Sequence, residues 1–271
     1  MNEIKYDKPP LLCVVVSIQF EKVTNFSDCH SALLEAFRGI GLTVPDSVKI
    51  NNIEFQPGGD SGPKVKWHET TKWDFKDPAR TTLIRIDENG VAIHFADYRS
   101  FEGKTEILLG IFEILDKAIP SLRVQRYVLR YVNHIPVTNS EDPSQWVNPA
   151  ILGLPNQPGL SLKRVGSVNE SIFESESGGQ LVLRCSTMGG GLTVPPDLFP
   201  IDLKFAVPFE SETPFIRLEN VHLLSIEELF KPSAALDRIS SLRQPISRLF
   251  TALTTQTAHQ QWQLRSTSNL S

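Results

Sequence analysis

The sequence predicts an α+β protein of two pseudo-repeated halves, each a curved antiparallel sheet packed on an amphipathic helix. Two observations predict this class. Segments with period-two alternation of apolar residues outnumber helical patterns. An order of strand, helix or irregular segment, several strands and closing helix occurs in residues 1–120 and again, in outline, in residues 121–271. This order resembles a helix-grip arrangement, in which a sheet curls around a long helix, and we expect one continuous structural unit.

The first half opens with a predicted strand over residues 12–20, whose second face becomes polar at Ser17 and Gln19. An apolar stripe predicts a helix over residues 27–40, which Ser27 can cap and Gly41 can end. Strands are expected over residues 48–55 and 64–75, with a loop at residues 57–63.

A hairpin is the clearest local signal in this half. Residues 82–86 and 91–95 flank Asn89-Gly90, the pair favoured in tight type I′ turns. A helix is then expected from Ser100, with one apolar stripe, until Pro120 ends it.

The second half opens with a long predicted strand over residues 122–137 and a short helical or irregular segment at residues 143–154. Further strands are expected over residues 160–174, 180–188 and 201–209. Residues 225–228, SIEE, form a capping-box pattern that predicts the start of the C-terminal helical region. Its apolar stripe covers residues 233–253, Pro245 should kink or split the helix, and residues 256–271 should form a frayed tail.

Composition places the chain among ordinary globular proteins, with 40% apolar and 21% charged residues. A net charge of −4 gives no whole-surface attraction for nucleic acid, so we expect no nucleic-acid partner. The longest apolar stretch is too short to span a bilayer, and residues 1–10 lack the apolar core of a signal peptide. Three widely spaced cysteines, Cys13, Cys29 and Cys185, favour reduced thiols in a cytoplasmic protein.

Three segments of the chain resemble a known family. They are Lys8-Pro9-Pro10-Leu11-Leu12 with the strand that ends Ile18-Gln19-Phe20, the mid-chain residues 126–135 (RYVLRYVNHI), and Ile246-Ser247-Arg248-Leu249-Phe250 followed by Thr254. Together they resemble a sporadically distributed family of uncharacterised bacterial and archaeal proteins, over essentially the whole chain. The most specific piece is Leu129-Arg130-Tyr131-Val132-Asn133, which is similar to the family's Leu-Arg-Tyr-Ile-Asn signature.

The chain departs from the family pattern at two places. It has Cys13-Val14 where the family usually has Glu-Ala, and Arg243 is the polar residue nearest to the place of a frequent helix histidine. The family has no established activity to carry over. Its patchy distribution resembles that of mobile defence and toxin–antitoxin genes, which implies a role in defence.

The signature strand supplies the candidate site residues. Alternation puts Arg126, Arg130 and His134 on one face, with Arg123 nearby, and a largely apolar set on the other. In an extended strand Arg126 and Arg130 lie about 13 Å apart along the chain, which suits a large anion or an acidic partner. The alternative is that each arginine pairs with a carboxylate on a neighbouring strand and belongs to the scaffold.

Motifs for catalysis or cofactor binding are absent from the sequence: there is no nucleophile elbow, zinc-protease motif or phosphate loop. The histidines and cysteines lack metal-ligand spacing, so we expect no metal and no cofactor. Trp67, Trp73 and Trp146 could line a hydrophobic ligand pocket, although core packing is the commoner role of such residues.

Three function classes remain. The first is a non-enzymatic recognition or regulatory protein, in antiviral defence or a toxin–antitoxin pair, that acts with a protein partner encoded nearby. The second is a binder of a lipid or small hydrophobic ligand in a helix-grip-like cavity. The third is an enzyme whose site is assembled from scattered residues, as catalytic triads are. The sequence leaves the oligomeric state open.

Overall fold

The structure is a computed structural model that describes residues 6–56, 64–138, 141–154 and 164–263. The predicted loop at residues 57–63, the first part of the predicted strand at 160–174 and the end of the predicted tail lie outside the described residues. The side chains of residues 50–70, that of Trp67 included, also lie outside the described part. Within the described ranges the chain is an α+β fold with one large antiparallel sheet.

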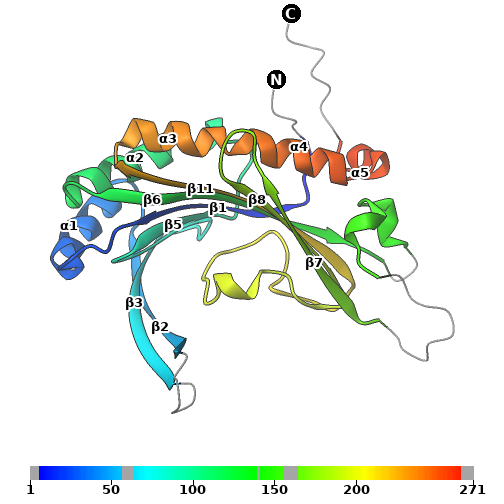
Figure 1. Cartoon of the computed structure of the whole chain (residues 1–271), viewed down its shortest axis with the longest axis horizontal. Helices are drawn as coiled ribbons and strands as arrows, with labels where there is room; N and C mark the ends of the chain where they lie inside the picture. The colour runs from blue at the N-terminus through cyan, green and yellow to red at the C-terminus, as the bar shows by residue number, and fades with distance from the viewer. Residues whose placement is uncertain (1–5, 57–63, 139–140, 155–163, 264–271) are drawn as a thin grey trace, which may run out of the picture.

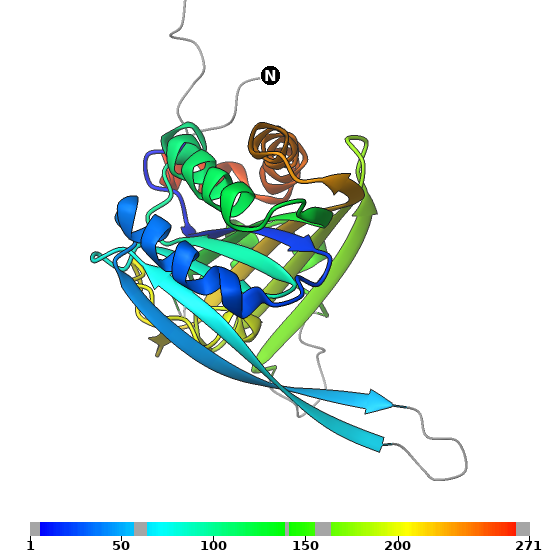
Figure 2. The ribbon, with the colours of Figure 1, turned by 90° about the vertical axis from the view of Figure 1, so that its left-hand side faces the viewer.

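The large sheet has nine strands in the order β2-β3-β4-β5-β1-β6-β11-β8-β7 (Figure 1). Their bounds are β1 Leu11–Phe20, β2 Val44–Gln56, β3 Lys64–Lys76, β4 Thr82–Asp87, β5 Gly90–Phe95, β6 Arg123–Pro136, β7 Gly166–Glu174, β8 Gln180–Met188 and β11 Phe215–Leu229. Two short strands, β9 (Gly191–Leu192) and β10 (Glu210–Ser211), form a separate pair. Figure 2 shows β2 and β3 extending beyond the rest of the sheet.

The strands of the two halves form two contiguous blocks that meet where β1 pairs with β6. In the first block β1 pairs with β5, the last strand of its half, and β4 and β3 follow outward. In the second block β6 pairs with β11, again the last strand of its half, and β8 and β7 follow outward. Every pair is antiparallel, so the two halves build one uninterrupted sheet.

One face of the sheet is covered by helices. These are α1 (Phe26–Gly39), α2 (Thr105–Ala118), α3 (Pro232–Ser241), α4 (Arg243–Leu253) and α5 (Gln256–Gln261) (Figures 1 and 2). Apolar spacing of three and four residues gives α2 a buried stripe of Leu108, Ile111, Phe112 and Leu115. That stripe joins β-strand residues such as Ile18, Tyr127 and Leu129 in the main core. Among the described residues no helix is long and apolar enough to cross a membrane.

The other face is partly covered by residues 193–209, called here the covering segment. Its apolar residues, among them Val194, Leu198 and Leu203, form a second core with Cys13 and Val132. Ion pairs also attach it to the sheet, since Lys76 Nζ lies 2.8 Å from an Asp202 carboxylate oxygen. The sheet is therefore buried on both faces near its centre and is open where the covering segment stops.

Most predicted elements are confirmed. The strands at residues 12–20, 82–86, 91–95 and 180–188 and the helices at 27–40 and 100–118 agree with the structure within a few residues. The predicted cap at Ser27 differs, because Ser27 lies inside α1. Asn25, with φ of 60°, precedes the helix, and its side chain makes no capping hydrogen bond. The chain breaks between α3 and α4 at Leu242, and Pro245 lies in the first turn of α4, where no intrahelical N–H is lost.

Three expectations for the second half are wrong. Residues 201–209 pair with no strand of the large sheet, because they run across its face as the covering segment. Residues 225–228 lie inside β11, where pairing with β6 overrides the local capping pattern. Residues 256–261 form α5, because Ala258 and Trp262 are buried against a core that also contains Trp146.

Candidate functional site

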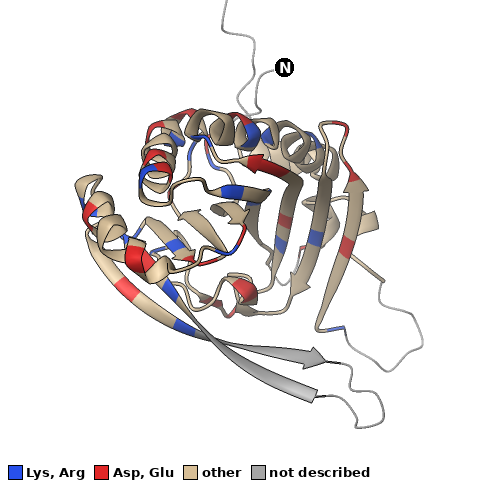
Figure 3. Ribbon diagram, turned by 60° about the vertical axis from the view of Figure 1, so that its left-hand side comes forward, with Lys and Arg blue, Asp and Glu red and all other residues tan. Residues whose placement is uncertain are grey.

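The signature strand β6 separates its residues onto two faces, as alternation predicts. Leu129 packs with the helices in the main core, and Val132 packs with the covering segment. Arg126, Arg130 and His134 share the face of Val132. The predicted site residues therefore lie on the face opposite the helices, where basic and acidic residues occur on neighbouring strands (Figure 3).

Arg130 belongs to a buried ion network. Its Nε donates to a Glu219 carboxylate oxygen at 3.1 Å, and its Nη1 donates to Asp197 at 2.6 Å. Arg217 Nε also donates to Glu219, at 3.1 Å. Burial disfavours the charged guanidinium of Arg130, but its bonds to Asp197 and Glu219 outweigh that effect and raise its pKa. Burial likewise raises the pKa of Asp197, and Arg130 reverses this, so that the pKa of Asp197 is lowered overall.

This network corresponds to the scaffold alternative for Arg130, because its carboxylate partners lie on β11 and on the covering segment. A buried guanidinium already bound by two carboxylates has little capacity left for an external anion. Of the two other predicted arginines, Arg123 is exposed and Arg126 is half-buried. Arg123 Nε is 3.3 Å from Glu21, and Arg126 Nε donates to Ser225 at 3.2 Å.

His134 and His94 are buried beside the ion network. The ring of His134 lies 4.8 Å from that of Phe215, and neither histidine has a hydrogen-bond partner for its ring nitrogens among the described groups. Burial lowers the pKa of His134, and burial with the nearby charges of Arg85 and Arg130 lowers the pKa of His94 to about 3. Both rings are therefore neutral near pH 7. In the described part of the chain no group of three or more His, Cys, Asp or Glu side chains could hold a metal ion.

The edge strand β7 carries exposed apolar side chains. Val168 is 63% exposed, Ile172 is 60% exposed and Phe173 is 42% exposed, with Val165 just before the strand. β7 pairs with β8 on one side only, so its other side ends the sheet. β7 also carries Glu170 and Glu174 among these apolar residues. The opposite edge strand, β2, differs because its described part holds Pro45, which has no backbone N–H to donate to an added strand.

Arg126 lies in a hollow that links β6 to the end of β7. The hollow has a volume of about 520 Å³ and is also lined by Glu174, Gln180, Leu223 and Ser225. The structure therefore brings Arg126 together with the exposed edge, and separates it from Arg130, which the network holds under the covering segment.

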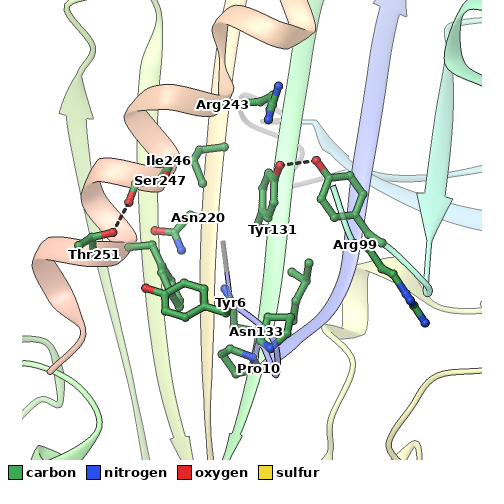
Figure 4. Close-up of a pocket in the computed structure, with 14 residues that line it drawn as sticks. Tyr6, Pro10, Arg99, Tyr131, Asn133, Asn220, Arg243, Ile246, Ser247 and Thr251 are labelled. Carbon is green, nitrogen blue, oxygen red and sulfur yellow. Dashed lines mark hydrogen bonds between the residues drawn. The ribbon is translucent and has the colours of Figure 1, made fainter. Parts of the chain in front are cut away.

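A second feature lies on the helical face, between α4, the sheet and the N-terminal segment. This α4 cavity has a volume of about 100 Å³ (Figure 4). Asn220 of β11 points into it and is fully buried, and neither atom of its amide has a hydrogen-bond partner among the described groups. All three segments that carry the family resemblance contribute to the lining, through Pro9–Leu11, Tyr131 with Asn133, and Ile246 with Phe250.

Sequence reasoning missed the α4 cavity for identifiable reasons. Tyr131 and Asn133 were assigned to a largely apolar core-facing set, and Asn220 lies on β11, a strand that the sequence did not predict. The signature itself was the one available signal, because it contains both Tyr131 and Asn133.

No family model matches the chain, and no curated protein matches its sequence significantly. The family resemblance thus stays a prediction, and the functional conclusions depend on the geometry of the β7 edge, the Arg126 hollow and the α4 cavity.

Proposed function

We propose that this protein is a non-enzymatic recognition or regulatory protein that binds a partner protein along the β7 edge. The observation that carries the proposal is the concentration of exposed apolar side chains on one edge strand. Natural proteins usually protect such an edge with charge, proline or a cover, because it presents a row of backbone donors and acceptors. A retained apolar edge therefore favours binding over protection.

The occupant that fits is an extended strand of the partner. Main-chain hydrogen bonds to β7 would supply affinity, and alternate side chains would contact Val168 and Ile172 on one face of the strand. The exposed acids Glu174 and Glu176 lie at the far end of β7 and in the turn that follows it. Their charge favours a partner strand with a basic residue at the matching end.

Arg126 extends this surface across the sheet. It lies in the same hollow as Glu174, the last residue of β7, and Gln180, the first residue of β8. We assign Arg126, and Arg123 as its exposed neighbour, to contact with an acidic group of the partner. Arg130 and His134 support the surface from beneath the covering segment.

Co-expression with the products of neighbouring genes tests the proposal. We expect one of them to form a complex that elutes together with the chain in size-exclusion chromatography. In that complex, β7 amides should exchange with deuterium more slowly, because strand addition protects backbone N–H groups. The variant Ile172→Lys should abolish the complex, and Arg126→Ala should weaken it while changing the free energy of unfolding by less than about 0.5 kcal/mol.

The matched control is Ile40→Lys, which places a lysine at another exposed apolar residue, 38% exposed, at the end of α1. It should leave the complex intact. The proposal fails if no neighbouring product binds, or if Ile172→Lys and Ile40→Lys affect the complex equally.

The two halves are proposed to be pseudo-repeats of a helix-grip type. The support is topological: in each block the first strand lies at the seam, the last strand of the half pairs with it, and helices follow on the same face. The related alternative of a lipid binder is less favoured, because the α4 cavity of about 100 Å³ is smaller than the ~150 Å³ cavity that holds one benzene.

The biological setting is proposed from the sequence. The resemblance favours antiviral defence or a toxin–antitoxin pair, and three free cysteines, two of them buried, favour a cytoplasmic location. Plaque counts on bacteria that carry the gene, or the Ile172→Lys variant, test the first point. Equal plaque counts with and without the gene would exclude a role in antiviral defence.

A further inference from the structure

The α4 cavity holds a polar group that the protein itself does not satisfy. Asn220 has no exposed surface, and its amide oxygen and nitrogen both lack a hydrogen-bond partner among the described groups. A buried amide with unmade hydrogen bonds is destabilising, so a residue of this kind calls for an explanation. The cavity provides one, because the amide faces open space (Figure 4).

Several other polar groups of the cavity are held in place by hydrogen bonds within the protein. Asn133 Nδ2 donates to the Leu218 carbonyl at 3.1 Å, and the hydroxyls of Tyr98 and Tyr131 lie 2.9 Å apart. The Thr251 hydroxyl donates to the Ser247 carbonyl at 2.9 Å. These bonds fix part of the wall, whereas Asn220 is a fully buried side chain of the described lining whose two polar atoms both lack a partner.

The chemistry of an asparagine amide restricts what it can bind. Its carbonyl accepts and its NH₂ donates in one plane, so its best complement is a planar group with an adjacent donor and acceptor. Amide and lactam edges have this arrangement, and the bidentate pairing of asparagine with adenine uses it. The ring faces and edges of Tyr6, Tyr131 and Phe250 supply walls on which a flat group can pack.

Charge restricts the ligand further. No carboxylate lines the cavity in the described structure, whereas Arg99 and Arg243 do. Arg243 lies 4.3 Å from the centre of the Phe101 ring and 3.3 Å from a Glu102 carboxylate oxygen, at the upper end of the cavity in Figure 4. A cationic ligand would find no counter-charge there, so a neutral or anionic ligand is favoured.

We propose that the α4 cavity binds a small planar molecule, neutral or anionic, through an amide or lactam edge that pairs with Asn220. A nucleobase and an aromatic carboxamide both present this edge. Because the cavity has a volume of only about 100 Å³, the amide edge alone would enter it, and the rest of the molecule would project past the exposed rim at Pro9 and Arg99. The site lies on the helical face and is independent of the β7 edge, so either proposal can fail alone.

Isothermal titration calorimetry on the full chain tests the site with adenosine, cytidine, uridine and nicotinamide at millimolar concentration. We expect at least one probe to bind, and the responding probes will separate nucleobase from carboxamide recognition. Replacing Asn220 with leucine keeps the approximate volume and removes both hydrogen bonds. It should weaken binding about tenfold or more, since one hydrogen bond is worth roughly a factor of ten.

Two further variants make the result decisive. Ser247→Phe fills the cavity from α4 without changing Asn220, and it should abolish binding even if Asn220→Leu folds poorly. Ser225→Ala, on the same strand but outside the cavity, should bind as the wild type does. The proposal is overturned if no probe binds to the wild type, which would leave the cavity to solvent, or if binding survives both cavity variants.

Discussion

Glu219 and Asn220 are neighbours on β11 and are equally buried, but they point to opposite faces of the sheet and differ in their hydrogen-bond partners. Glu219 faces the covering segment, where Arg130 and Arg217 bind its carboxylate. Asn220 faces α4, where its amide meets a cavity and no described partner. The first face satisfies its buried charges internally, and the second leaves a neutral polar group available.

The difference follows from what each group costs when unpaired. An isolated buried carboxylate is so unfavourable that the fold must bring cations to it. Arg130 and Arg217 bind Glu219 here, and Arg184 lies at the edge of ion-pair distance, 4.0 Å away. A neutral amide costs only about 1–3 kcal/mol when its bonds are unmade, which a stable protein can tolerate. Residues of the second kind are therefore better candidates for ligand contact than the buried charges beside them.

The largest expected effect comes from removing the buried carboxylate of Glu219. Glu219→Leu leaves Arg130 and Arg217 buried without their shared carboxylate, and should lower the free energy of unfolding by about 3–5 kcal/mol. Urea denaturation measures the change. Glu170→Leu is the control, because Glu170 pairs with Arg184 in the open and should cost less than about 1 kcal/mol. Similar losses in both variants would show that the buried network has no special role.

A pH titration examines the same face through its histidines. The pKa of His94 is about 3 in the folded protein and near 6.5 when unfolded, so the unfolded chain takes up the proton first as the pH falls. The stability from this residue is present above pH 6.5 and is lost toward pH 3, with about 2 kcal/mol gone by pH 5. His134, whose pKa is also lowered, acts in the same direction.

Urea denaturation at pH 7 and pH 5 measures this loss. In His94→Leu the difference between the two pH values should become smaller, because one titrating group has been removed. An unchanged difference would mean that His94 is accessible to protons in the folded state.

The smallest expected effect comes from replacing Asn220, the uncharged residue of the pair. Asn220→Leu removes an amide whose hydrogen bonds are unmade, and should raise the free energy of unfolding by about 1 kcal/mol. Asn133→Leu provides the contrast, because it removes the bond to the Leu218 carbonyl and should be destabilising. If Asn220→Leu is as destabilising as Asn133→Leu, the amide of Asn220 makes bonds that stabilise the fold.

The sequence predicted those elements whose local signals agree with their tertiary setting. The β4–β5 hairpin follows from Asn89-Gly90 and alternation, and α2 follows from its apolar stripe and Pro120. β11 was missed because it lies inside the sheet and is buried on both faces in its first half. Its buried polar residues Arg217, Glu219 and Asn220 conceal the alternation that marks a half-exposed strand.

The candidate sites could be predicted only in part for the same reason. Arg126 and Arg130 were identified on one face of β6, but the carboxylates that separate their roles come from β11 and the covering segment. Neither segment was placed correctly from the sequence. The α4 cavity requires three segments from distant parts of the chain, and no pattern within any one of them records that they meet.

The position of β6 between β1 and β11 has a consequence for synthesis on the ribosome. β6 can pair with β1 as soon as it emerges, but its other neighbour begins only at Phe215, roughly 80 residues later. At about 5–20 residues per second, the growing chain exposes the free side of β6 for on the order of 4–16 s. During that interval the nascent protein presents a long central strand as a temporary edge, which makes this stage the one at which a chaperone has most to protect.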